Sequence, residues 1–265
     1  MGRSPGGAVP LIASLIYHEI TDDPATSGFQ RASALPYKHT RAAFARHLDE
    51  IAASPCVPEL VTAVDFAASG RHLLLTFDDG GRSASYVSEE LSRRGWFGHF
   101  FIVTSLIGSR TFLSASDIRE IRSRGHIIGT HTHTHPDIFR EQPVARMLEE
   151  WRTSCARLAD LLGEPCTVGS VPGGDVSRAV FESAGTAGVR FLFTSEPWLR
   201  PRRVAGCWIL GRGILKTTTP PTRVGELARF RGWARALFAR RMKVLLCTLF
   251  PYAYRYYIRR TAEKA

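Results

Sequence analysis

The stretch LLLTFDDG at residues 73–80 decides the fold, because an apolar run ends there at two acids and a glycine. Such a run is typical of a buried strand whose carboxyl end opens into a polar site. About fifty residues later a second stretch, GTHTHTHP at residues 129–136, also follows an apolar run. A carboxylate with two imidazoles is a common ligand set for a catalytic divalent metal such as zinc, and it leaves a coordination position for water. The second carboxylate is then free to take a proton from that water.

Further apolar runs recur along the chain, with helical segments between them. Most are continuous rather than alternating, as expected for a parallel sheet that is covered on its outside. The alternation predicts βα units, and therefore either a barrel or a doubly wound sheet, and seven such runs favour a barrel. In a barrel the site lies at the carboxyl ends of the strands, where both polar stretches fall. The predicted strands are Leu11–Tyr17, His72–Phe77, Gly98–Val103, His126–Gly129, Thr167–Val171, Val189–Phe193 and Cys207–Leu210.

The composition is that of a globular protein. A chain of 265 residues, 44% of them hydrophobic, can bury a large core, which excludes a disordered chain. No apolar stretch reaches the roughly 18 residues that a membrane-spanning helix needs. The first apolar run, Leu11–Ile16, is short, so we interpret it as a core strand rather than as part of a signal peptide. The five cysteines are scattered without a CxxC pair, which fits reduced thiols, and we therefore expect a cytoplasmic protein.

The net charge of +11 is concentrated near the C-terminus. From Arg200 to Ala265 there are 16 Lys and Arg against two acids, a net +14, so the remainder carries −3. We therefore predict a catalytic barrel over residues 1–215 and a basic helical tail over residues 216–265, with an amphipathic helix over Thr222–Arg241. The apolar face of that helix either docks on the barrel or lies at an anionic membrane surface at the inner face of the membrane. Nucleic acid is disfavoured as a partner, since no known binding motif accompanies the charge.

Both polar stretches resemble motifs of the polysaccharide deacetylases, carbohydrate esterase family 4. TFDDG at residues 76–80 is similar to the family's first motif, and HTHTH at residues 131–135 is similar to its second, His-Ser/Thr-x-x-His. SVPGG at residues 170–174 resembles a divergent third motif. YHE at residues 17–19 is similar to the segment that ends the first strand in many members. The resemblance covers roughly Leu11 to Gly211, and the first two motifs are specific only together.

This resemblance implies a distorted (β/α) barrel that removes acetyl groups from an N-acetylated sugar with the help of a divalent metal ion. It implies that Asp79, His131 and His135 are the metal ligands and that Asp78 is the general base. Backbone N–H groups of the third motif, around Pro172, Gly173 and Gly174, could then hold the developing oxyanion. Zinc suits such ligands, but so do cobalt, nickel and iron.

The chain departs from the family pattern at two points. The family usually supplies a late histidine as general acid, and no histidine follows His135. An arginine often steadies the base from the third motif, where this chain has Ser170 and Val171. We expect His18 to act as the acid, because it ends a predicted strand on the face where the site should lie.

Several alternatives remain open at this stage. If the second motif is extended, His133 shares a face with its neighbouring histidines and could compete as a ligand. Trp198 either lines the substrate groove and stacks on a sugar ring or is simply packed. The protein is accordingly expected to be a metal-dependent deacetylase acting on an amino sugar in a glycan or a lipid-linked precursor. Its alternatives are a metal- and glycan-binding pseudoenzyme and a hydrolase of C–N bonds in a non-sugar amide.

Overall fold

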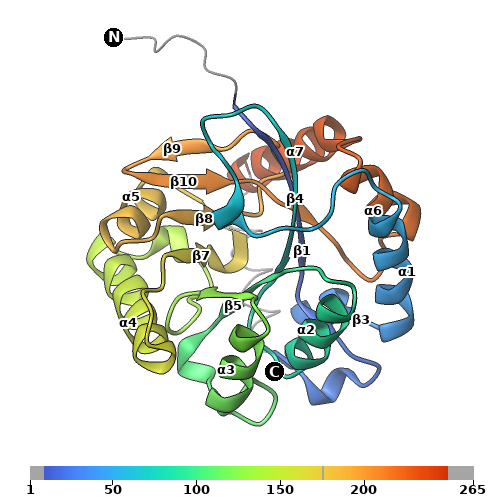
Figure 1. The fold of residues 1–265 in the computed structure, drawn as a ribbon. Coiled ribbons are helices and arrows are strands. Elements are labelled where there is room, and N and C mark those ends of the chain that lie inside the picture. Colours follow the sequence, from blue (N-terminus) through green and yellow to red (C-terminus); the bar gives the residue numbers. More distant parts are fainter. Residues whose placement is uncertain (1–8, 175, 250–265) are drawn as a thin grey trace.

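A curled sheet of nine strands forms the centre of the computed structural model, which describes residues 9–174 and 176–249 (Figure 1). The strand order is β11-β1-β4-β5-β6-β7-β8-β10-β9, and every neighbouring pair is parallel except β10 with β9. The predicted distorted (β/α) barrel is confirmed, and the seven predicted strands correspond to β1, β4, β5, β6, β7, β8 and β10. The bounds are β1 (Leu11–Tyr17), β4 (Arg71–Phe77), β5 (His99–Ile102), β6 (Ile127–Thr130), β7 (Val168–Ser170), β8 (Phe191–Phe193), β9 (Arg202–Val204), β10 (Cys207–Leu210) and β11 (Gly213–Ile214).

Helices follow the strands and cover the outside of the sheet (Figure 1). Their ends follow local chemistry: the Thr40 hydroxyl caps α1, and Ser114 with Asp117 forms a capping box at α3. Gly163 ends α4 in the left-handed conformation that an L-residue adopts only at a cost. The helices are α1 (Arg41–Ala52), α2 (Ser83–Arg93), α3 (Ala115–Ser123), α4 (Val144–Leu162), α5 (Arg178–Thr186), α6 (Pro221–Ala228) and α7 (Trp233–Leu249). A short second sheet pairs β2 (Glu19–Ile20) with β3 (Lys38–His39).

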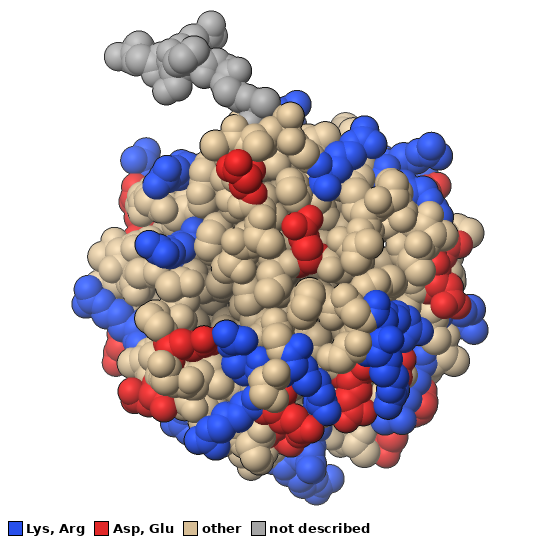
Figure 2. Space-filling view, viewed as in Figure 1, with Lys and Arg blue, Asp and Glu red and all other residues tan. Residues whose placement is uncertain are grey.

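The segment between α1 and β4, residues 53–70, closes the amino-terminal end of the barrel. Val61 and Val64 from this segment pack in one cluster with inward side chains of the strands, such as Phe101 and Phe193. The Val61 amide donates a hydrogen bond of 2.9 Å to Nε2 of His99, at the first residue of β5. In Figure 1 this segment crosses the front, and Figure 2 shows the middle of the same face as mostly uncharged. A substrate must therefore approach from the other end, where the strands finish.

The C-terminal tail is not the single helix predicted over Thr222–Arg241. It is broken into α6 and α7, because Phe230 and Gly232 adopt φ values of 63° and 71°, which interrupt the helix. Helix α6 packs on α1 and contributes Val224 and Leu227 to the main core.

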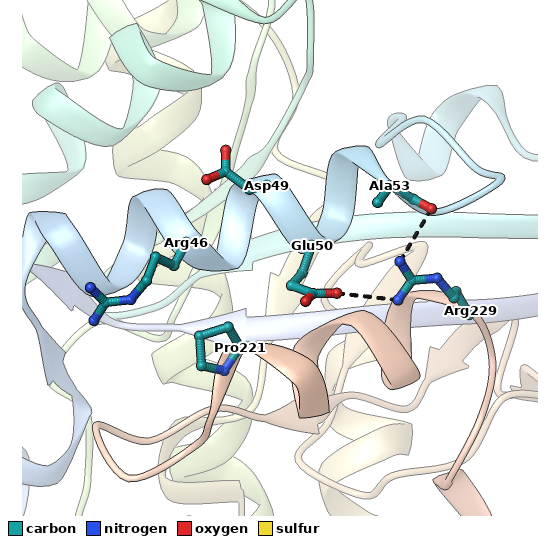
Figure 3. Close-up of a pocket in the computed structure, with 6 residues that line it drawn as sticks. All are labelled: Arg46, Asp49, Glu50, Ala53, Pro221 and Arg229. Atoms are coloured by element: carbon teal, nitrogen blue, oxygen red, sulfur yellow. Dashed lines mark hydrogen bonds and ion pairs between the residues drawn. The ribbon is translucent and has the colours of Figure 1, made fainter.

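Arg229, just after α6, stabilises the packing of α6 on α1. Its guanidinium lies 3.3 Å from the Glu50 carboxylate and 3.2 Å from the carbonyl of Ala53 (Figure 3). The start of the tail therefore docks on the barrel, whereas the boundary predicted between residues 215 and 216 stays a prediction. Part of the predicted tail, residues 250–265, lies outside the described residues. In the part of the chain that the structure describes, no helix has both the length and the apolar character needed to cross a bilayer.

Candidate active site

The carboxyl ends of β4, β6 and β7 bring the predicted polar stretches together at the open end of the barrel. Asp78 and Asp79 follow β4 directly, His131 follows β6, and Ser170 ends β7. His135 lies four residues beyond His131 in the loop that leaves β6. Because these strands are parallel, the polar side chains after them meet at one edge, as the sequence predicted.

Asp79, His131 and His135 converge closely enough to hold one metal ion. Their nearest ligand atoms all lie within 4.8 Å of one another. Oδ1 of Asp79 is 3.5 Å from Nε2 of His131 and 3.8 Å from Nε2 of His135. These separations exceed a good hydrogen bond, but they suit a tetrahedral ion with bonds of about 2.0–2.1 Å, whose ligands lie about 3.4 Å apart. The residues present therefore fit a divalent cation.

The backbone at this cluster is held in an unusual conformation. Asp79 and His135 have φ values of 77° and 55°, and Thr132 between the histidines has 65°. Non-glycine residues in this left-handed region cost on the order of 1–3 kcal/mol each, and they persist where the surroundings impose them. Two of the three candidate ligands are thus strained, a pattern typical of a site that fixes its geometry before a ligand binds.

Threonines and one buried acid shape the loop that carries the histidines. The Thr130 hydroxyl accepts from the Thr132 amide at 3.0 Å, and the Thr132 hydroxyl accepts from the His135 amide at 3.2 Å. Glu150 of α4, only 1% exposed, accepts from the amides of His133 and Thr134 at 2.8 and 2.7 Å. Sequence reasoning missed this role, because Glu150 lies within a long helix and only the tertiary fold brings it to the loop.

His133 points away from the candidate metal position. Its Nδ1 lies 3.0 Å from the Thr104 hydroxyl, and the cluster of potential ligands does not include it. The loop is not extended, so the three histidines do not share one face.

Asp78 is held by a buried arginine from a distant strand end. Arg212, after β10, donates from Nη1 to Oδ1 of Asp78 at 2.7 Å and from Nη2 to Oδ2 at 2.9 Å. Both side chains are almost fully buried, and the guanidinium also donates to the Thr194 carbonyl at 2.9 Å. The arginine that contacts Asp78 is therefore Arg212, after β10, and not a residue near Ser170. The sequence contained a sign of this contact, because a cation within the apolar stretch LGRGIL at residues 210–215 must find a partner when it is buried.

Ser170 connects Asp78 to the candidate metal ligand His131. Its hydroxyl donates to Oδ1 of Asp78 at 3.2 Å and lies 2.6 Å from Nδ1 of His131. One hydroxyl has one proton, so Ser170 must accept from the Nδ1–H of His131. In the neutral His131 ring, Nε2 then has the free lone pair that a metal ligand requires.

The pKa values show which groups carry charge. Burial alone would raise the pKa of Asp78, but the Arg212 charge outweighs it and holds that pKa below its ordinary value. Burial would likewise raise the pKa of Asp79, and its close approach to His131 and the charges of the nearby histidines lower it instead. Burial lowers the pKa of His135 to about 3, so this imidazole is neutral and able to bind a cation.

His18 faces the same site from the end of β1. Its ring packs against that of Tyr37 at a tilt of 38°, with 4.6 Å between centroids. Its Nδ1 is buried with no hydrogen-bond partner among the described residues. Burial lowers the pKa of His18, and the charges of Asp79 and Asp78 raise it in part, which places the ring within the field of both carboxylates.

The third motif lies next to this cluster, as a turn after β7. Gly173 and Gly174 have φ values of 64° and 69°, and a Cβ on Gly174 would lie 2.5 Å from the Cβ of Ser195. Glycine is thus required at residue 174, whereas the oxyanion role of Pro172, Gly173 and Gly174 stays a prediction. The Arg202 guanidinium lies 4.2 Å from the centroid of the Trp198 ring, and Trp198 also packs against a cluster of buried hydrophobic residues. Its contact with substrate also stays a prediction.

Glu19 is a buried acid that contacts the segments next to the site. The hydroxyls of Ser27 and Ser83 both donate to its Oε2, which links the loop after β2 to the start of α2. A Cβ on Gly81 would lie 2.1 Å from its Oε1, so the chain just after Asp79 packs tightly on this carboxylate. Burial raises the pKa of Glu19 to about 7, although the serine hydrogen bonds and Lys38 partly oppose the rise.

This raised pKa makes stability depend on pH in a defined direction. The native state holds the Glu19 proton up to about pH 7 and the unfolded state only to about 4.5, so Glu19 makes stability fall as pH rises between these values. The shift corresponds to about 3 kcal/mol. We expect Glu19→Gln to remove this contribution in urea unfolding measured from pH 4.5 to 8. A constant difference in unfolding free energy between wild type and variant across that range would contradict the assignment.

Comparisons with known proteins agree with this geometry. Residues 67–192 match the family model described as polysaccharide deacetylase. A polysaccharide deacetylase from Bacillus cereus superposes with a TM-score of 0.68 at 18% identity, over 82% of this chain and 69% of that one. IcaB from Ammonifex degensii gives 0.66 at 21%, over 83% and 97%. The Streptococcus pyogenes deacetylase PplD, in complex with acetate, gives 0.64 at 16%, over 85% and 99%.

The match to the polysaccharide deacetylase model confirms the resemblance to this family that the motifs predicted. This match and the fold support a deacetylase. The structures at this level of identity establish the fold, and the roles of individual residues rest on the geometry of the site itself.

Proposed function

We propose that the protein is a metal-dependent hydrolase that removes N-acetyl groups from an amino sugar in a glycan or a lipid-linked glycan precursor. One observation carries the proposal: Asp79, His131 and His135 converge beside Asp78, which Arg212 holds in place. The match to the polysaccharide deacetylase model further supports a glycan as the substrate.

The residues divide the chemistry between them. A divalent ion, for which we propose Zn²⁺, would be held by Asp79, His131 and His135, and it would supply a water of lowered pKa and polarise the acetyl carbonyl. Asp78 would act as the general base that accepts a proton from the attacking water. Because Arg212 keeps Asp78 ionised, the carboxylate is available as a base at neutral pH. Amide groups near Gly173 and Gly174 hold the developing negative charge.

Acetate release from N-acetylated oligosaccharides tests this proposal, with metal-loaded protein and with protein treated with a chelator. The proposal expects release that depends on metal and returns when metal is restored. Bound metal without release across a broad panel of sugars would favour the glycan-binding pseudoenzyme. Release confined to non-sugar amides would favour the alternative C–N hydrolase.

His18 is proposed as the acid that protonates the leaving amine. Its unpartnered Nδ1 and its place in the field of Asp78 and Asp79 support this role. We expect His18→Ala to lower turnover by roughly 10²-fold or more, because general acid catalysis contributes about that much. Metal content, measured in parallel, should match that of the wild type. An unchanged turnover number would remove His18 from the mechanism.

A further inference from the structure

Helix α7 exposes large apolar side chains between cations. Phe238 is 67% exposed and Met242, one turn further, is 41% exposed, so they share one helix face. Arg235 and Arg241 lie three residues before and after Phe238, and both are exposed. The sequence of α7 contains four cations and no acid. This face therefore combines apolar bulk with positive charge and lacks any acidic residue that could offset it.

The opposite side of α7 is fixed to the rim of the active site. Nε of Arg240 lies 2.7 Å from Oε1 of Glu196, and Nη2 donates to the Gly174 carbonyl at 2.9 Å. Gly174 belongs to the turn after β7, at the carboxyl end of the strands. Trp233, at the start of α7, is buried in the main core. The exposed face of α7 thus borders the end of the barrel at which substrate enters.

A second segment of the rim shows the same combination. Leu35, in the short helix η2 (Ala32–Tyr37), is 50% exposed. The ring of Tyr37 in that helix packs against His18, which places the segment beside the site. Nζ of the exposed Lys216 lies 5.4 Å from the centroid of the Tyr37 ring. Exposed apolar side chains on α7 and η2, and exposed cations on α7 and at Lys216, thus lie beside residues of the site.

We propose that this end of the molecule docks on the surface of an anionic phospholipid bilayer. Phe238, Met242 and Leu35 would enter the interfacial region, and Arg235 and Arg241 would lie among the lipid phosphates. The net charge of +14 over residues 200–265 complements such a surface. This docking would turn the site towards the bilayer. Together with the proposed function, on which this step rests, it makes a lipid-linked N-acetylated glycan the substrate class. A nucleic acid would match the cations but not the exposed Phe238 and Met242 between them.

Vesicle flotation of the full chain tests the docking. We expect flotation with phosphatidylcholine vesicles that contain phosphatidylglycerol, and little with phosphatidylcholine alone. The double variants Phe238→Ser with Met242→Ser and Arg235→Gln with Arg241→Gln should each weaken binding roughly tenfold or more. Val57→Ser is the matched control, because Val57 is 66% exposed in the segment that closes the opposite end of the barrel, and it should bind as the wild type does.

Equal flotation with neutral and anionic vesicles, or double variants that bind like the wild type, would overturn the docking proposal. Displacement of the protein from vesicles by DNA, with tighter binding to DNA than to lipid, would also overturn it in favour of nucleic acid. Acetate release from a soluble N-acetylated oligosaccharide, measured on the same variants, should be unchanged. Lost flotation with intact release therefore rejects the docking alone, whereas flotation without release rejects the proposed function.

Discussion

Replacing Asp78 by asparagine is expected to lower acetate release by roughly 10²–10⁴-fold, the range that a positioned general base contributes. The amide is similar in size to the carboxylate but cannot take a proton from water. It also leaves the Arg212 charge without a counterion, since both carboxylate oxygens now accept from that guanidinium. The variant therefore tests the base and its positioning together, and stopped assays at a saturating metal concentration would measure it.

A measurement of bound metal distinguishes the role of Asp78 as a base from the role of a metal ligand. Asp78→Asn should retain its metal, measured by elemental analysis, because the cluster consists of Asp79, His131 and His135. Asp137→Asn is the matched control, since Asp137 lies close to the same loop but forms a surface ion pair with Arg31 at 3.0 Å. Such pairs contribute at most about 1 kcal/mol, so this variant should keep its activity. Wild-type turnover in Asp78→Asn would assign the base to another group.

Removing an imidazole of the cluster is expected to abolish both metal binding and activity. In His135→Ala, only Asp79 and His131 remain, and two ligands hold a divalent ion far more weakly than three. Metal content should fall close to zero after dialysis, and acetate release should fall to background. Thermal unfolding gives an independent measurement, because metal at about 100 times its dissociation constant stabilises the wild type by about 2.7 kcal/mol. The variant should show no such gain.

His133→Ala is the control for this variant, since it removes an imidazole from the same loop. His133 contacts Thr104 rather than the cluster, so its loss should leave metal content and the metal-dependent gain in stability nearly unchanged. If His133→Ala lost its metal while His135→Ala retained it, the ligand set would have to be reassigned.

The strands and the candidate ligands could be predicted from the sequence, because both depend on local patterns. Continuous apolar runs predicted the central strands. Asp79 and His131 are polar residues just after two of these runs, and both belong to the cluster of candidate ligands. The strand β9 was missed, since RRV at residues 202–204 is short, basic and exposed at the sheet edge. The break between α6 and α7 was missed as well, because Phe230 adopts a left-handed conformation that cannot be predicted from its residue type.

Residues that act through distant partners could not be predicted in the same way. Arg212 lies 134 positions from Asp78 in the sequence, and Glu150 lies 17 from His133 on a separate helix. No spacing rule connects such pairs, and only the parallel sheet with its covering helices brings them together. The buried charge of Arg212 was nevertheless a usable sign, because an isolated guanidinium is costly to remove from water.

The bond between Asp78 and Arg212 also has a mechanical consequence. The sheet order runs from β11 to β9 without returning to its start, and β4 and β10 lie five positions apart in it. Arg212 lies between β10 and β11, so this ion pair, together with the hydrogen bond from Arg212 to the Thr76 hydroxyl at 3.2 Å, ties the segment that connects the two sides of the open sheet to the end of β4. The group proposed as the base thus also holds parts of the barrel together, so its replacement would have to be compensated by other contacts in the barrel.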